Sequence, residues 1–277
     1  RRLAGGFDAE RAVLFARLAG AAYCSPEALA NWSCGENCVP DLSGPVMVCA
    51  GDTTQAYIGK HRGEGLVAFQ GTKSVTSMVQ DLRFFRNVTP WAPCAGCNVH
   101  MGFLSEWLSL RPCVERSLRK IARGPIRVTG HSLGGAVGTL AMVSLASSGW
   151  RVKEAYTFGS PRVGDANFSL VFSSLMSGNA AFRVTHHQDP VPHLPPEDFG
   201  FMHVAPEVFI DGNSGNSPAV VCAGAEDVRC AGQYNDIPAD IFHLGDHLDY
   251  MGVRTCSAGC SPARGRRHEE GAATVVV

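Results

Sequence analysis

The chain has 277 residues, a formal net charge of -1 at pH 7 and 18% charged residues. This length is sufficient for one large α/β core, whereas the near-neutral charge excludes a broad basic surface for nucleic acid or an anionic membrane. No run of about 18 apolar residues is present, so we expect no transmembrane segment. The chain begins with Arg1 rather than Met, and we expect a mature or trimmed form.

Predicted strands and helices alternate along the chain. Apolar residues at helical spacing predict helices, and short apolar runs bounded by glycine or proline predict strands. We expect helices at residues 7–22, 103–122, 136–145 and 166–176, with a last one after His247. We expect strands at residues 46–50, 55–60, 66–69, 126–129, 154–158 and 182–185, with another beginning at His203. This order predicts an α/β fold with a mostly parallel central sheet flanked by helices, and it places ligands at the carboxyl ends of the strands.

The domain organisation is expected to be simple. No linker is visible before residue 261, so residues 1–260 are predicted to form a single domain. The segment 261–277 mixes charge, glycine and alanine without periodicity, which predicts a disordered tail. We expect the protein to be a monomer.

Eleven cysteines indicate an oxidised, secreted protein, because disulfides are rare in reducing compartments. Sequons at Asn31, Asn87 and Asn167 fit a glycoprotein of the secretory route. The odd number of cysteines leaves at least one thiol unpaired. The expected bridges are Cys34–Cys38, Cys94–Cys97 and Cys222–Cys230, and Cys24 with either Cys256 or Cys260.

The spacing of Cys94 and Cys97 also occurs in redox dithiols and in half of a zinc site. A redox pair normally opens a helix after a strand, and zinc requires a second matching pair, which the sequence lacks. A structural disulfide is therefore favoured, and we expect neither a metal nor another cofactor.

Ser132 lies between two glycines where an expected strand meets an expected helix. Gly130 and Gly134 complete the pattern Gly-x-Ser-x-Gly, the elbow that presents a serine hydroxyl above a sheet edge. Chance alone produces this pentapeptide roughly 0.26 times in a chain of this composition, so the flanking strand and helix carry the argument. The helix N-terminus beside the serine favours a developing oxyanion. Ser132 is therefore the candidate nucleophile.

A serine nucleophile needs a histidine that accepts its proton and an acid that orients the imidazole. Asp189 follows a late strand, which Pro190 ends, and is the candidate acid, although an Asp-Pro pair also occurs as a simple turn. His247 lies further along, just before the expected last helix, and is favoured as the base. His243 is the competitor, and its apolar neighbours favour a packing role.

An oxyanion hole needs two hydrogen-bond donors, and the backbone N–H of Leu133 supplies one. A strand ends at Gly71, and Thr72 follows it. Thr72 is the expected second donor through its backbone N–H, with its hydroxyl fixing the loop or donating as well. The alternative is that Gly71 and Thr72 only form a turn.

Seven motifs in order resemble the class 3 lipase family, the fungal triacylglycerol-lipase type of α/β-hydrolase. They are AYC with W-x-C at 22–34, VAFQGT at 67–72, CAGCNVHMGF at 94–103, VTGHSLGGA at 128–136, TFGSPRVGD at 157–165, QDPVPHLPP at 188–196 and DHLDYMG at 246–252. The resemblance implies an α/β-hydrolase fold with Ser132 as nucleophile, Asp189 as acid and His247 as base. It also implies oxyanion donors at Thr72 and Leu133, in agreement with the choices above.

The resemblance further implies a lid over about residues 73–92. In these lipases a short amphipathic segment follows the first oxyanion residue and moves away at an oil–water interface. The apolar lid and substrate-binding residues would be Val75, Met78, Val79, Leu82, Phe84, Phe85 and Trp91. The alternative is a helix packed permanently on the core. The lid stripe itself lacks tryptophan, a departure that argues against strong interfacial activation.

The resemblance implies a secreted serine hydrolase that acts on lipid esters at an oil–water interface, without a cofactor. A feruloyl esterase and a phospholipase A1 of the same fold are alternatives, and the apolar lid stripe argues against the first. A catalytically silent lipid-binding protein on the same scaffold is a remote alternative, since a fold alone does not determine function.

Overall fold

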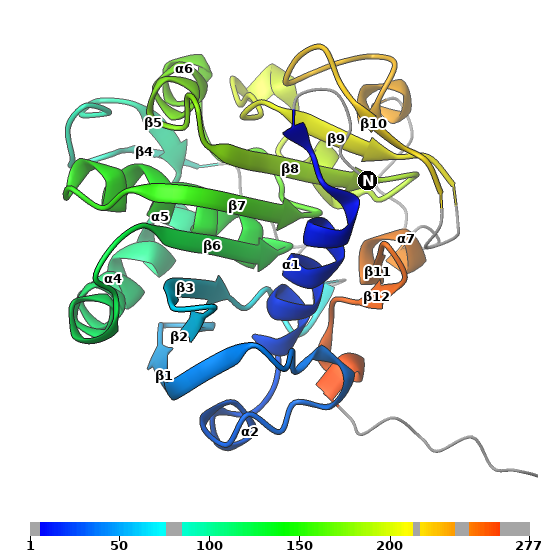
Figure 1. The fold of residues 1–277 in the computed structure, drawn as a ribbon. Helices are drawn as coiled ribbons and strands as arrows, with labels where there is room; N and C mark the ends of the chain where they lie inside the picture. Colours follow the sequence, from blue (N-terminus) through cyan, green and yellow to red (C-terminus); the bar gives the residue numbers. More distant parts are fainter. Residues whose placement is uncertain (1–5, 76–84, 213–216, 236–243, 261–277) are drawn as a thin grey trace, which may run out of the picture.

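The computed structural model describes residues 6–75, 85–212, 217–235 and 244–260 (Figure 1). Within these residues, eight strands form one sheet in the order β1-β2-β3-β6-β7-β8-β9-β10. β3, β6, β7, β8 and β9 run parallel, and β1, β2 and β10 extend the sheet antiparallel. The strands are β1 (Leu42–Ala50), β2 (Gln55–His61), β3 (Glu64–Phe69), β6 (Ile126–His131), β7 (Val152–Phe158), β8 (Ala180–His186), β9 (Glu207–Ile210) and β10 (Ala219–Val221). This sheet confirms the predicted α/β fold.

Helices cover both faces of the sheet (Figure 1). α1 (Ala9–Ala21) lies on one face, and α4 (Met101–Ile121), α5 (Leu133–Ser147) and α6 (Ala166–Leu175) pack together on the other. A short helix, α2 (Pro26–Ala30), follows α1, and a small two-stranded sheet joins β4 (Arg86–Val88) to β5 (Asn98–His100). No helix in the described part of the chain is long and apolar enough to span a membrane.

β3 shows how a strand of this sheet contributes to two separate cores. Leu66 and Ala68 belong to the apolar cluster on the α1 face, whereas Val67 and Phe69 belong to the cluster that contains α4 and α5. Since both faces are buried, the strand is an uninterrupted apolar run rather than an alternating one. This explains why residues 66–69 were recognisable as a strand.

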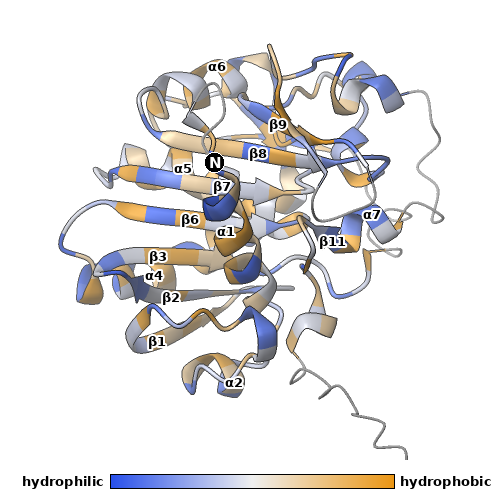
Figure 2. Cartoon of the chain, turned by 45° about the vertical axis from the view of Figure 1, so that its right-hand side comes forward, coloured by the Kyte–Doolittle hydropathy of each residue, from blue (hydrophilic) through white to orange (hydrophobic). Residues whose placement is uncertain are grey.

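An ion-pair network lies at the amino ends of β3, β6 and β7, where blue segments interrupt β6 and β7 in Figure 2. Arg127 pairs with Glu64 and, at 3.2 Å from Nε to Oε2, with Glu154. Arg11 of α1 donates to Glu154 Oε1 at 2.9 Å, which ties α1 to the sheet. His61 Nδ1 accepts from Arg127 Nη1 at 3.0 Å. Burial and the Arg127 charge lower the pKa of His61 to about 4.

The three predicted local disulfides are confirmed. Because Cys94 and Cys97 bond to each other, they are not zinc ligands in this structure. Among the residues that the structure describes, no three or more His, Cys, Asp or Glu side chains are grouped to hold a metal ion. The local bridges are Cys34–Cys38, Cys94–Cys97 and Cys222–Cys230.

Two further disulfides join distant parts of the chain. Of the two partners left open for Cys24, the structure selects Cys260, which ties the end of α1 to the last described residues. Cys49–Cys113 joins β1 to α4 and was not predicted, because its 64-residue separation leaves no local signal. All eleven cysteines are described, and Cys256 carries the free thiol.

The predicted strand beginning at His203 is wrong. The strand in this region, β9, begins at Glu207, because Pro206 has no N–H to donate to a sheet ladder. His203 instead lies in the preceding loop, where its Nε2 donates to the carbonyl of Pro192 at 2.7 Å. The predicted tail at 261–277 lies outside the described residues.

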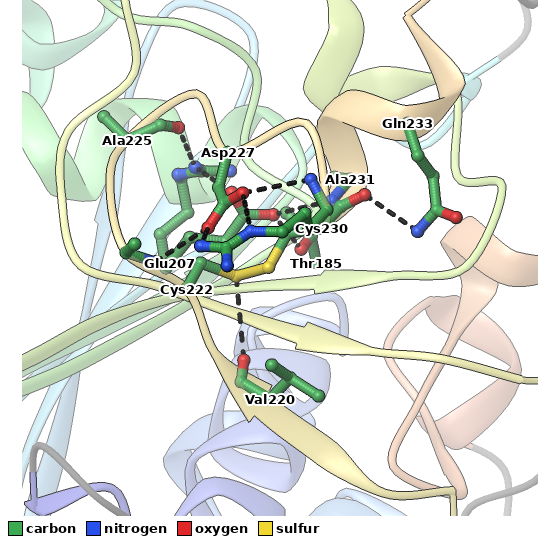
Figure 3. Close-up of a disulfide and its surroundings, with 12 residues drawn as sticks. Thr185, Glu207, Val220, Cys222, Ala225, Asp227, Cys230, Ala231 and Gln233 are labelled. Carbon is green, nitrogen blue, oxygen red and sulfur yellow. Dashed lines mark hydrogen bonds and ion pairs between the residues drawn. A yellow bond between two sulfur atoms is a disulfide. The ribbon is translucent and has the colours of Figure 1, made fainter.

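The Glu207 side chain links β9 to β8 by hydrogen bonds, beside the Cys222–Cys230 disulfide (Figure 3). It is 1% exposed, accepts from Thr185 Oγ1 at 2.6 Å and pairs with Arg183 Nη2 at 2.9 Å. Both partners lie on β8, the strand that leads into the loop carrying Asp189. The buried carboxylate therefore helps to fix the start of that loop.

Candidate active site

Ser132 occupies the sharp turn between β6 and α5. Its φ of 59° and ψ of -130° lie where residues other than glycine are rarely found. A Cβ at Gly130 would lie 2.2 Å from the carbonyl oxygen of Gly134, and a Cβ at Gly134 would lie 2.3 Å from that of Phe69. Both positions therefore exclude any side chain, which is the physical reason for glycine on either side of the serine.

Asp189 and His247 are hydrogen-bonded to each other in the protein interior. His247 Nδ1 lies 2.9 and 2.8 Å from the two carboxylate oxygens of Asp189. The Val191 N–H donates to Asp189 Oδ1 at 2.9 Å. His247 is 0% exposed and Asp189 is 1% exposed. The carboxylate thus fixes the imidazole orientation and directs Nε2 to the opposite side.

The end of β7 brings Ser132 to this pair. The Ser132 N–H donates to the carbonyl of Phe158 at 2.8 Å. The next residue, Gly159, touches both partners, since a Cβ there would lie 2.8 Å from Asp189 Oδ2 and 3.0 Å from His247 Cε1. Among the described residues, Ser132 Oγ and His247 Nε2 are both buried without a hydrogen-bond partner. These are the two atoms between which a serine–histidine pair transfers a proton.

The two candidate oxyanion donors come from the start of α5 and from the loop after β3. Leu133 is the first residue of α5, whose first N–H groups have no acceptor within the helix. Thr72 follows Gly71, and a Cβ at Gly71 would lie 3.0 Å from Ser132 Cβ. Thr72 and Leu133 are both half-buried. The β3 end therefore lies directly against the elbow.

His247 lies within the short helix α7 (Leu244–Leu248), so its predicted place just ahead of a helix is wrong. The residues after it form the hairpin of β11 (Asp249–Tyr250) and β12 (Val253–Arg254). Met251 and Gly252 both have positive φ, 58° and 76°, which suits a two-residue hairpin turn rather than a helix.

Tyr250 is a site residue that the sequence analysis missed. Its Oη donates to Asp189 Oδ2 at 2.5 Å, and the side chain is fully buried. Burial and the adjacent Asp189 charge raise the pKa of Tyr250 well above its ordinary value, so the phenol remains a donor. The available signal was its position three residues after His247.

His131, the residue before Ser132, supports the candidate base from the other side of its backbone. Its Nε2 lies 2.8 Å from the carbonyl oxygen of His247, which can only accept, so Nε2 donates. Nδ1 then accepts from Tyr23 Oη at 2.8 Å. Burial and the neighbouring His247 lower the pKa of His131 well below its ordinary value. His131 is therefore neutral and holds the backbone of His247.

Three of the predicted lid residues, Val75, Phe85 and Trp91, are described, and they differ in their exposure to solvent. Val75 is half-buried and Phe85 is 57% exposed. Trp91 is buried in the core, with the Arg111 guanidinium 5.9 Å from its ring centroid. Met78, Val79, Leu82 and Phe84, and the competing base His243, lie outside the described residues.

Comparisons with known proteins identify the family and the fold of this chain. The family model for Lipase (class 3) matches residues 66–199. The secreted mono- and diacylglycerol lipase 1 of Fusarium solani is 35% identical over 259 residues, which cover 86% of this chain and 75% of that protein. The crystal structure of a lipase from Rhizopus microsporus var. chinensis superposes with a TM-score of 0.77 and 28% identity, covering 91% of this chain and 89% of that one.

A second solved structure is a triacylglycerol lipase whose catalytic centre is formed by a serine protease triad. It superposes with a TM-score of 0.74 and 28% identity, covering 91% of this chain and 96% of that one. The sheet and its helices are therefore an α/β-hydrolase fold, and the resemblance seen in the seven sequence motifs is confirmed. This chain belongs to the class 3 lipase family, whose members are carboxylic ester hydrolases.

Proposed function

We propose that the protein hydrolyses carboxylic esters of lipids through an acyl-enzyme on Ser132, with His247 as general base and Asp189 as its orienting acid. The His247–Asp189 hydrogen bond is the observation that carries this proposal. Ser132 Oγ and His247 Nε2 support it, because both are buried without a partner among the described residues. A hydroxyl oxygen and an imidazole nitrogen that are free of other partners are what proton transfer from serine to histidine requires.

The reaction proceeds in two halves. His247 Nε2 takes the proton of Ser132 Oγ as that oxygen bonds to the ester carbonyl carbon, and the N–H groups of Thr72 and Leu133 bind the resulting oxyanion. The intermediate collapses, and the departing alcohol takes the proton from His247. Water then gives a proton to His247 and attacks the acyl-enzyme, and His247 returns that proton to Ser132 Oγ as the carboxylic acid is released.

We infer that the first part of the segment 73–92 acts as a lid over this site, since Trp91 near its end is buried in the core. Ser132 and His247 are fully buried, so an ester reaches them only after a covering segment has moved. Met101 donates its N–H to the carbonyl of Phe85, so an exposed apolar residue of this segment and one at the start of α4 are neighbours. An exposed apolar surface of this kind suits contact with an oil–water interface.

We also propose that the protein acts outside the cell. Five disulfides among the described cysteines support an oxidising compartment, because a reducing one would not maintain them. The Fusarium solani relative is itself named as secreted, which supports the same location. Recovery of active protein from culture medium, with thiol titration that finds one free cysteine, tests this.

The decisive test is Ser132→Ala assayed on emulsified glycerides. We expect hydrolysis to fall by roughly a thousand-fold or more. Ser144→Ala is the matched control, since Ser144 is also a fully buried serine but lies within α5, away from the elbow. An organophosphonate should label Ser132 in the parent protein, and full activity of Ser132→Ala would refute the proposal.

The substrate class is tested in parallel. Glycerides of several chain lengths, methyl ferulate and a phospholipid are offered to the parent enzyme under identical conditions. Preference for glycerides supports the proposal, whereas preference for methyl ferulate or the phospholipid points to the other esterases of this fold.

A further inference from the structure

Asp246, the residue before His247, is in hydrogen-bond contact with residues 186–188. These three residues directly precede Asp189. His187 Nδ1 lies 3.0 Å from Asp246 Oδ2, and the Gln188 N–H donates to the same oxygen at 3.2 Å. His186 Nδ1 lies 2.9 Å from the carbonyl oxygen of Asp246, and its Nε2 lies 2.8 Å from that of Gly212. Four consecutive residues of one segment therefore bind two consecutive residues of the other.

The short helix α7 explains why its backbone needs these partners. The last four carbonyl groups of a helix accept no hydrogen bond from within the helix. Since α7 has only five residues, most of its carbonyl groups are in this position. His186 binds the carbonyl of Asp246, and His131 binds the carbonyl of His247 at 2.8 Å. The base is thus held by side chains from β8 on one side and from β6 on the other.

The backbone of His187 is unusual. Its φ of 38° lies in the left-handed region, which a residue with a Cβ rarely adopts. The same residue donates its N–H to the carbonyl of Ile210 at 2.9 Å and directs its ring to Asp246. Strained backbone that is retained by surrounding hydrogen bonds is concentrated at functional sites.

The His187–Asp246 contact is shielded from solvent. The two side chains are only 22% and 18% exposed, and the ring of Tyr234 lies 5.6 Å from that of His187. A hydrogen bond in such a place constrains geometry more effectively than one at the open surface. The His187–Asp246 contact is therefore suited to holding the segment that carries Asp189 against the segment that carries His247.

We propose that Asp246 is a positioning residue that sets the distance and angle between His247 and Asp189 through its attachment to residues 186–188. The proposal rests on the proposed roles of Ser132, His247 and Asp189. Asp246 acts through His247 and does not touch the reacting atoms. A shift of about 1 Å in a catalytic group is sufficient to reduce turnover about a hundred-fold.

The test compares Asp246→Ala with Asp246→Asn on a soluble chromogenic ester. We expect Asp246→Ala to lower kcat by about 10- to 100-fold with little change in KM. Asp246→Asn keeps an oxygen that accepts both bonds, so its kcat should stay within about three-fold of the parent value. Asp249→Ala is the matched control, since Asp249 accepts from Gly252 in a nearby turn, and its kcat should also stay within about three-fold.

A second readout does not depend on hydrolysis. The Nδ1 proton of His247, hydrogen-bonded to Asp189, should give a downfield proton resonance in the parent, Asp246→Asn and Asp249→Ala proteins. We expect that resonance to be lost or displaced in Asp246→Ala. If the parent hydrolyses no ester, the proposed function fails, and the resonance still decides whether Asp246 positions His247.

The proposal is overturned if Asp246→Ala keeps both its kcat and the resonance, or if Asp246→Asn is as impaired as Asp246→Ala. Circular dichroism checks that each variant is folded. If Asp246→Ala does not fold, His187→Ala decides, because it removes one of the three contacts and should lower kcat about 3- to 10-fold. An unchanged kcat in a folded His187→Ala would then refute the proposal.

Discussion

Tyr250 Oη lies 2.5 Å from Asp189 Oδ2, the oxygen that also lies 2.8 Å from His247 Nδ1. One short segment of chain therefore supplies both the candidate base and a donor to the acid. Hydrogen bonds to a charged group are stronger than neutral ones, so this contact helps to hold the carboxylate in its orientation toward His247.

Tyr250→Phe removes this donor without changing the ring. We expect kcat/KM to fall about 10- to 100-fold, because a hydrogen bond to a charged group contributes roughly 1.5–3 kcal/mol. Tyr57→Phe is the matched control, since Tyr57 is also fully buried and donates to the carbonyl of Leu18 at 2.9 Å. It should lower stability and leave kcat/KM unchanged. Equal kinetics for Tyr250→Phe and the parent would contradict the role given to Tyr250.

Gly134→Ala places a Cβ against the backbone of the elbow. The 2.3 Å approach to the Phe69 carbonyl oxygen cannot be relieved by a side-chain rotation, so we expect at least about 2 kcal/mol of destabilisation. Gly138→Ala lies one turn further along α5, and its nearest neighbour would be 3.4 Å away. Alanine favours the helix by about 1 kcal/mol there, so stability should hold or rise. Urea unfolding measures the free energy of unfolding of both variants. Equal values for Gly134→Ala and Gly138→Ala would show that the elbow is not tightly packed.

His61 makes the stability of the fold dependent on pH. Its pKa is about 4 in the folded protein because of burial and Arg127, and about 6.5 in an unfolded chain. The unfolded state therefore binds more protons between these values, so this contribution is present above about pH 6.5 and is lost as pH falls toward 4. His61→Gln should reduce the slope of unfolding free energy against pH by up to about 1.4 kcal/mol per unit. Urea titrations at pH 5, 6, 7 and 8 measure it, and an unchanged slope would show that His61 is not the group responsible.

Removal of the Cys24–Cys260 bridge should cost far more stability than removal of Cys34–Cys38. The bridges span 236 and 4 residues, and a longer closed loop restricts the unfolded chain more. Alanine pairs at each bridge should differ by about 3–4 kcal/mol in the chain-entropy model. Equal losses by calorimetry would show that local contacts, rather than loop closure, determine the effect.

The sequence was informative wherever the signal was local. The alternation of elements, the elbow glycines and three short disulfides all depend on residues close together in the chain, and the structure contains them. Cys49–Cys113 and the contacts of His131 depend on segments 64 or more residues apart, which only the folded sheet brings together. Tyr250 was missed for a related reason, because its partner Asp189 is 61 residues away.

The ion-pair network of Arg127, Glu64 and Glu154 lies at the amino ends of the strands, whereas Ser132 and Asp189 follow the carboxyl ends. Loops at one edge of the sheet can thus be exchanged while the charges at the opposite edge continue to hold the scaffold. For protein engineering, this separation means that libraries for new acyl specificity belong in the loops after the strands. Stabilising substitutions can be accumulated independently at the other edge.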